Sequence, residues 1–290
     1  MAANWKQIAW NGICFKIPDS WEIGRIGARH LILEDGSEPA LEIKWGSVKG
    51  KFSHSAHLKR LGALQTGRVK KTFKEWILPP EWDQALTDFH TVGFAWQAET
   101  KAGRGVILYC PSCRNATLIQ FFQPKSDGAE KIFPEVLRAF QDHREDGLVD
   151  WSVFDIRAVM PANFKLVQHR FEAGKYRLTF AHGAQKICLY RWAPASVLLE
   201  ARNLRQFGET ITDFCAGDPA PIVIGGLQML EWNSSPRFKR LSRFKPKPSF
   251  HGLRLWHLEE NNRILGVKVQ GKRAFDTPLL NRICAGYESL

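Results

Sequence analysis

Two apolar stretches, RGVILYCPSCRNATLIQFF at Arg104–Phe122 and HGLRLWHLEENNRILGVKV at His251–Val269, decide the fold of this 290-residue chain. They align with each other without a gap, and the alignment matches Gly105 with Gly252, Tyr109 with Trp256, and Asn115 with Asn262. Each stretch is broken once by a short run of turn-forming or polar residues, which is typical of two strands joined by a tight turn. Each is therefore predicted to form a β-hairpin, with turns at residues 110–115 and 257–262.

Further matching segments extend this similarity over both halves of the chain. GICFKIPDSWEI at 12–23 matches DIRAVMPANFKL at 155–166, and ALEIKWGS at 40–47 matches ICLYRWAP at 187–194, with Trp45 on Trp192. Each half ends in a helical pattern, EKIFPEVLRAFQDH and TPLLNRICAGYES, whose apolar residues fall on one face. We therefore predict an α+β fold in which an antiparallel sheet with flanking helices occurs twice, as a tandem duplication. The polar segment QDHREDGLVD sets the predicted domains at 1–146 and 147–290.

The motif FKIPDSW at Phe15–Trp21, together with the order of elements, resembles the PsbP-like fold family. That family includes the photosystem protein PsbP, a Ran-binding nuclear-import factor and the bacterial DcrB and Eag-type modules. In the second half the resemblance rests on the shorter VMPANF. It implies non-catalytic modules that bind partner proteins through the sheet or its rim. The family has no shared catalytic set, so the resemblance assigns no site residues.

The positive charge of the chain is concentrated in two windows that contain no acidic residue. The net charge is +12, and the residues between Glu42 and Glu75 and between Glu231 and Glu259 carry nine and seven cations. Since these cations outnumber the net charge, the rest of the chain is not positive. Such clustering indicates an anion-binding surface, and the second window also interleaves aromatic residues that can stack on bases. Charged loops and helix faces that merely contact solvent are the alternative.

The predicted contacts to an acidic partner come from both windows. They are Lys49, Lys51, Lys59, Arg60, Arg68, Lys70, Lys71, Lys74, Arg237, Lys239, Arg240, Arg243, Lys245 and Lys247. If the partner is a nucleic acid, the phosphates are expected to contact the windows at Lys44–Lys74 and Arg237–Arg254. Trp76 and Trp82, beside the first window, are expected in an exposed loop.

Cys110-Pro-Ser-Cys113, in the predicted turn of the first hairpin, is the sharpest motif for chemistry. Two thiolates in a tight turn can bind one Zn²⁺, but a structural zinc site needs four ligands. The HxxH pair His54 and His57 is the best complement in the sequence. A redox role is disfavoured because the redox type of CxxC opens a helix, and two half-buried thiols without metal are the alternative.

The chain is predicted to be a non-enzymatic adaptor or chaperone-like protein whose basic, aromatic-containing surface binds an acidic protein or a nucleic acid. Phosphate-binding loops, nucleophile elbows and HExxH motifs are missing from the sequence, so an enzyme using Cys110 and Cys113 is the last alternative. No cofactor other than zinc is expected. The sequence has no apolar segment of membrane-spanning length and no signal-peptide pattern at its start, which predicts a cytoplasmic location with reduced cysteines.

Overall fold

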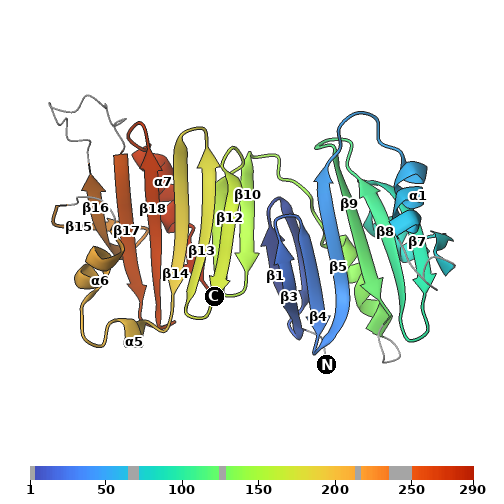
Figure 1. The fold of residues 1–290 in the computed structure, drawn as a ribbon, viewed down its shortest axis with the longest axis horizontal. Helices are drawn as coiled ribbons and strands as arrows, with labels where there is room; N and C mark the ends of the chain where they lie inside the picture. Colours follow the sequence, from blue (N-terminus) through green and yellow to red (C-terminus); the bar gives the residue numbers. More distant parts are fainter. Residues whose placement is uncertain (1–3, 65–71, 124–128, 213–216, 235–249) are drawn as a thin grey trace. The chain divides into compact units, whose positions relative to one another are not determined.

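The computed structural model describes residues 4–64, 72–123, 129–212, 217–234 and 250–290. It divides the chain into two compact units, Met1–Glu145 and Asp146–Leu290. Figure 1 shows that strands dominate both units. No helix in the described part of the chain has the length and apolar character needed to cross a bilayer.

The first unit is built on a seven-stranded antiparallel sheet in the order β3-β4-β5-β9-β8-β7-β6. Its strands are β3 (Trp21–Gly27), β4 (His30–Asp35), β5 (Glu38–Ser47), β6 (Lys74–Trp76), β7 (His90–Gln97), β8 (Ala102–Tyr109) and β9 (Asn115–Phe122). A hairpin of β1 (Trp5–Trp10) and β2 (Ile13–Pro18) precedes the sheet. The helices are α1 (His54–Leu64), α3 (Pro80–Ala85), the 3-10 turn η1 (Ala129–Ile132) and α4 (Phe133–Arg138).

The second unit has a seven-stranded antiparallel sheet in the order β12-β13-β14-β18-β17-β16-β15. Its strands are β12 (Lys165–Glu172), β13 (Lys175–His182), β14 (Gln185–Trp192), β15 (Ala220–Ile224), β16 (Leu227–Ser234), β17 (Phe250–Leu258) and β18 (Arg263–Gly271). Strand β11 (Ile156–Pro161) pairs with β10 (Leu148–Val153) and with β19 (Glu288–Ser289). The helices are α5 (Ala195–Leu198), α6 (Leu204–Ile211) and α7 (Thr277–Ala285).

Both predicted hairpins are confirmed, because β8 pairs with β9 and β17 with β18. The strands of the two seven-stranded sheets also follow the same order along the chain. That the two halves arose by duplication stays a prediction. The residue matching, however, was wrong by one position. Arg114, and not Asn115, is the counterpart of Asn262, since Arg114 (φ 58°) and Asn262 (φ 52°) are the left-handed residues that close the two turns.

The matching of Trp45 with Trp192 fails for the same reason. The Trp45 indole donates to the Asn11 carbonyl in the turn between β1 and β2, at 3.2 Å. Trp192 instead packs edge-on against Phe207 of α6, with ring centroids 5.3 Å apart. The two side chains therefore leave equivalent sheets by opposite faces, as a one-residue slip in a strand requires.

The predicted fold class was also wrong, because the protein is mostly β. Strands make up 52 % of the structure and helices 19 %, so the helices do not form flanking layers. The pattern at 130–143 yields only the six-residue α4, which stops at Arg138, and α1 contains no buried residue.

The two faces of the second sheet are covered differently. One face packs on the β10–β11 hairpin and the C-terminal segment, where Trp151 meets Phe180 and Trp256 meets Tyr287. On the other face, α5 and α6 close a core over β16 and β17 that contains Trp192, Phe207 and Trp232 (Figure 1). No described helix packs on that second face where it crosses β12, β13 and the start of β14.

Candidate functional site

The turn between β8 and β9 holds Cys110 and Cys113 in a fixed bend. The Cys110 amide donates to the Asn115 carbonyl at 3.0 Å, and the Arg114 amide donates back to the Cys110 carbonyl at 2.9 Å. Cys110 is buried and Cys113 is partly exposed. The turn therefore presents two sulfur atoms from a backbone held by its own hydrogen bonds.

The residues that face these sulfurs follow α4. Phe140 leaves the helix and packs on Phe15, with ring centroids 6.5 Å apart. Gln141 then forms an antiparallel bridge with Cys14, through two backbone hydrogen bonds of 2.8 Å. This bridge fixes the next two residues, Asp142 and His143, beside the hairpin turn.

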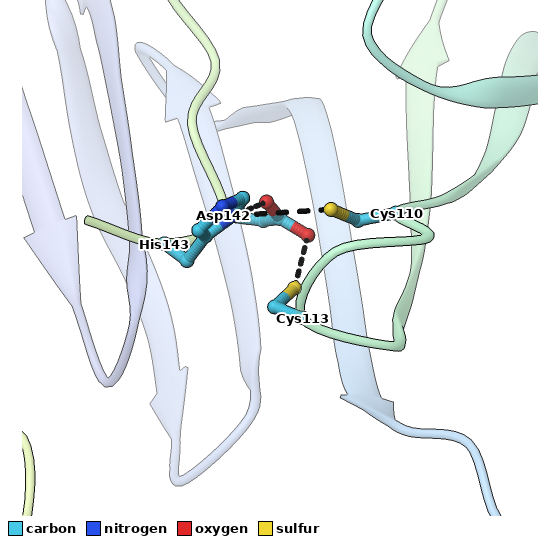
Figure 2. A group of neighbouring side chains, drawn as sticks. All are labelled: Cys110, Cys113, Asp142 and His143. Atoms are coloured by element: carbon cyan, nitrogen blue, oxygen red, sulfur yellow. Dashed lines mark hydrogen bonds and ion pairs between the residues drawn. The ribbon is translucent and has the colours of Figure 1, made fainter. Parts of the chain in front are cut away.

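Cys110, Cys113, Asp142 and His143 form one cluster, with all four donor atoms within 4.8 Å of one another (Figure 2). The Cys113 thiol donates to Asp142 Oδ2 at 3.0 Å, and His143 Nδ1 lies 2.7 Å from Asp142 Oδ1. Cys110 Sγ lies 3.8 Å from His143 Nδ1. Burial, followed by the hydrogen bond to Asp142, raises the pKa of Cys113 to about 12.

His54 and His57 are placed elsewhere, so the structure does not bring them to the two cysteines. His54 Nε2 lies 3.1 Å from the His90 carbonyl, and His57 Nδ1 lies 2.9 Å from the Ser53 carbonyl. Both rings also pack on Phe52, with centroids 4.6 Å away. Burial lowers the pKa of His54.

Part of the first basic window lies in the described structure, and its cations there are exposed. These are Lys44, which pairs with Glu42 at 2.7 Å, and Lys49, Lys51, Lys59, Arg60 and Lys74. Arg68, Lys70 and Lys71 lie outside the described residues, as do Arg237, Lys239, Arg240, Arg243, Lys245 and Lys247. The expectation for Trp82 was wrong, because its side chain is buried against Phe121 and Phe133.

Arg254, at the end of the second window, does not belong to a basic surface. Its side chain is 5 % exposed, and its Nε donates to Glu231 Oε1 at 2.6 Å. A guanidinium that is buried in an ion pair cannot reach a phosphate.

The structure adds a basic surface that the sequence did not indicate. It lies on the face of the second sheet that α5 and α6 cover in part, beside the core beneath them, where neighbouring strands bring together cations that are far apart in the chain. We call it the sheet tract; its members are Arg170, Lys175, Arg177, Lys186, Tyr190 and Lys268. Glu172, which pairs with Arg170 at 3.1 Å, is an acidic neighbour on β12. The signal available in the sequence was the alternation of Lys175 and Arg177 in KYRLTFAH at 175–182.

No family model matches the chain, and no curated protein matches it in sequence. Among solved structures, the immunity protein TplEi of T6SS from Pseudomonas aeruginosa is similar, with 12 % identity, a TM-score of 0.37, and coverage of 98 % of this chain and 97 % of that one. The Saccharomyces cerevisiae Ran-binding protein Mog1p has 10 % identity and a TM-score of 0.33, and covers 49 % of this chain and 96 % of its own. TM-scores this low carry no argument about fold family or function, so the resemblance to the PsbP-like family stays a prediction.

Proposed function

We propose that this protein is a non-catalytic binding protein and that its sheet tract holds an acidic segment of a partner protein. The observation that carries the proposal is that Arg170 and Arg177 lie directly opposite each other on neighbouring strands. Like charges at such positions destabilise a sheet, and the Glu172 carboxylate, 3.1 Å from Arg170, compensates only one member of the pair. An acidic ligand on this face offsets that cost.

The surroundings of the arginine pair leave room for an added acceptor. Arg177 donates through Nη2 to Gln168 Oε1 at 3.0 Å, but its Nε is buried without a hydrogen-bond partner. Lys186 lies on the next strand, β14, and Lys268 of β18 lies directly opposite Cys188 of β14. Carboxylates form short, charge-assisted hydrogen bonds with such groups, and arginine can bind them through two nitrogens at once.

The aromatic content of the tract favours a protein over a nucleic acid. Single-stranded nucleic acids bind sheet faces by stacking bases on open aromatic rings. Tyr190, the aromatic member of the tract, is itself stacked on Trp192 at 4.9 Å, and Lys175 lies over its ring at 5.8 Å. A base therefore finds no free ring there, whereas an acidic peptide needs only the cations.

Charge reversal within the tract tests the proposal. The variant Arg170→Glu/Arg177→Glu is compared with Arg273→Glu/Arg282→Glu, which changes the net charge equally at two exposed positions outside the tract. The probe is fluorescent poly-L-glutamate, measured by anisotropy at about 150 mM salt. We expect the tract variant to weaken binding about tenfold or more and the control about twofold or less.

Equal losses in the two variants, or none in either, would sink the proposal. A parallel titration with a single-stranded oligothymidylate tests the nucleic-acid alternative. If the oligonucleotide binds more tightly than poly-L-glutamate and loses affinity in the tract variant alone, the partner is a nucleic acid and the protein assignment is wrong.

A further inference from the structure

Asp142 is a buried carboxylate with no fixed cation beside it. Its side chain is 3 % exposed, and its polar contacts in the described part of the chain are the Cys113 thiol and the His143 ring. Burying a carboxylate is costly unless a positive charge or several donors compensate. Two sulfurs and an imidazole around such a group are what a soft divalent cation needs, and the cation would supply the compensating charge.

The spacing of the four donors suits a tetrahedral ion. With Zn–S bonds of about 2.3 Å and Zn–N bonds of about 2.0–2.1 Å, the edges of a tetrahedron are about 3.8 Å between sulfurs and about 3.6 Å between sulfur and nitrogen. The Cys110 Sγ to His143 Nδ1 distance is already 3.8 Å, and no two donors are farther apart than 4.8 Å. Small changes of side-chain torsion are enough to close the set.

The geometry points to a structural Zn²⁺ site formed by Cys110, Cys113, Asp142 and His143. It is a closed four-ligand set, as structural zinc sites are, and it ties the β8–β9 turn to the segment that follows α4. On binding, the two thiols release their protons to solvent and become thiolates, while His143 binds through Nδ1 and keeps its proton on Nε2. The half-exposed His143 ring gives the ion a path of entry.

Local backbone geometry directs both cysteines of the turn toward the cluster. Arg114, with a φ of 58°, lets the chain turn back immediately after Cys113 so that both sulfurs face one side. Figure 2 shows the two cysteines approaching Asp142 from one turn and His143 lying beside the same carboxylate. This inference is independent of the sheet tract, which lies in the other unit.

The test uses the full chain, reduced, stripped of metal with EDTA and titrated with Co²⁺. We expect one Co²⁺ per chain, with the intense visible bands of a tetrahedral ion and a sulfur-to-cobalt charge-transfer band, both lost when Zn²⁺ is added. Cys113→Ser should weaken Zn²⁺ binding by about 100-fold or more, and Asp142→Asn and His143→Gln by about tenfold or more. His143→Gln alters a partly exposed side chain, so it is informative even if the cysteine variant does not fold.

Two matched controls separate this ligand set from its competitors. Cys188→Ser removes a thiol outside the cluster, and His54→Gln/His57→Gln removes the HxxH pair; each should leave Zn²⁺ affinity within about twofold. Equal effects of the HxxH variant and of His143→Gln would overturn the assignment, as would a weak octahedral Co²⁺ spectrum or no bound metal. Zn²⁺ should also slow air oxidation of Cys110 and Cys113 to a disulfide. An unchanged rate in saturating Zn²⁺ would show that the pair is not ligated and would refute the site.

Discussion

Replacing Arg254 by methionine distinguishes a buried structural ion pair from a surface cation. Arg254 on β17 donates through Nε to Glu231 Oε1 on β16, at 2.6 Å, and through Nη1 to Asn281 Oδ1 on α7, at 2.8 Å. One guanidinium thus joins two strands and the last helix of the second unit. Methionine keeps most of the length of the side chain and removes the charge and all five donors.

The expected loss follows from what remains behind. Glu231, whose side chain is 20 % exposed, keeps its charge but loses its cation. Removing one partner of a buried pair costs about 3–5 kcal/mol, because the other charge stays buried without compensation. At about 2–4 °C per kcal/mol for a unit of this size, we expect the Tm to fall by roughly 6–20 °C.

Differential scanning calorimetry measures the Tm, and Arg282→Met on α7 is the matched control. It makes the same chemical change at an exposed position, so the Tm should move by about 2 °C or less. The double variant Glu231→Gln/Arg254→Met should recover part of the loss, since it no longer buries an unpaired carboxylate. Both arginine variants should elute from heparin at the same salt concentration. If Arg254→Met is as stable as the control yet elutes earlier, Arg254 is a surface contact and the reasoning fails.

Two further predictions concern the second unit. Gly208→Ala on α6 should lower the free energy of unfolding by about 1–3 kcal/mol, measured by calorimetry, because the added Cβ would lie 2.3 Å from Trp232. The control Gly217→Ala should be neutral, since a Cβ there has no atom within 4 Å. Equal Tm values for the two variants would contradict the close packing at Gly208. Burial raises the pKa of Cys284 to about 11 from 9.0, so its contribution to stability is complete below pH 9 and is lost as pH rises through 11. The Tm of Cys284→Ala should therefore decline less than wild type between pH 9 and 11, and parallel curves would refute the shift.

The hairpins could be predicted from the sequence, but the matching between halves could not be placed to the residue. In a strand the side chains alternate between faces, so a shift by one position still aligns apolar residues with apolar residues when both faces are buried. Both faces are buried at β8 and β17, where Val106 and Ile107 lie beside each other in the core, as do Leu255 and Trp256. The glycine and tryptophan matches therefore looked convincing in the wrong register, and only the turn residues Arg114 and Asn262 resolve it.

Clusters of cations could be predicted only where their members are close together in the sequence. Counting signs along the chain found Lys49 and Lys51, which are exposed, but it also counted Arg254, which is buried against an acid 23 residues earlier. It missed the sheet tract because Arg170 and Lys268 lie on one sheet face only through the pairing of β12, β13, β14 and β18. The tract strands also carry apolar residues on their other face, such as Leu178, Leu189 and Val267, and these separate the cations in a linear count.

The proposed metal ligands show why half of a site can be predicted from sequence. Cys110 and Cys113 need only the bend of one hairpin, so their spacing carries the signal. Asp142 and His143 reach that bend because the bridge between Gln141 and Cys14 stops the chain from continuing as a helix past Arg138. Two consecutive residues such as Asp142 and His143 have no spacing that indicates metal binding. The HxxH spacing of His54 and His57, in contrast, is typical of a ligand pair. The imidazoles of that pair are instead engaged by Phe52 and by backbone carbonyls. Tertiary contacts therefore decide which residues complete the proposed ligand set. Comparing the Zn²⁺ affinity of His143→Gln with that of His54→Gln/His57→Gln tests this assignment directly.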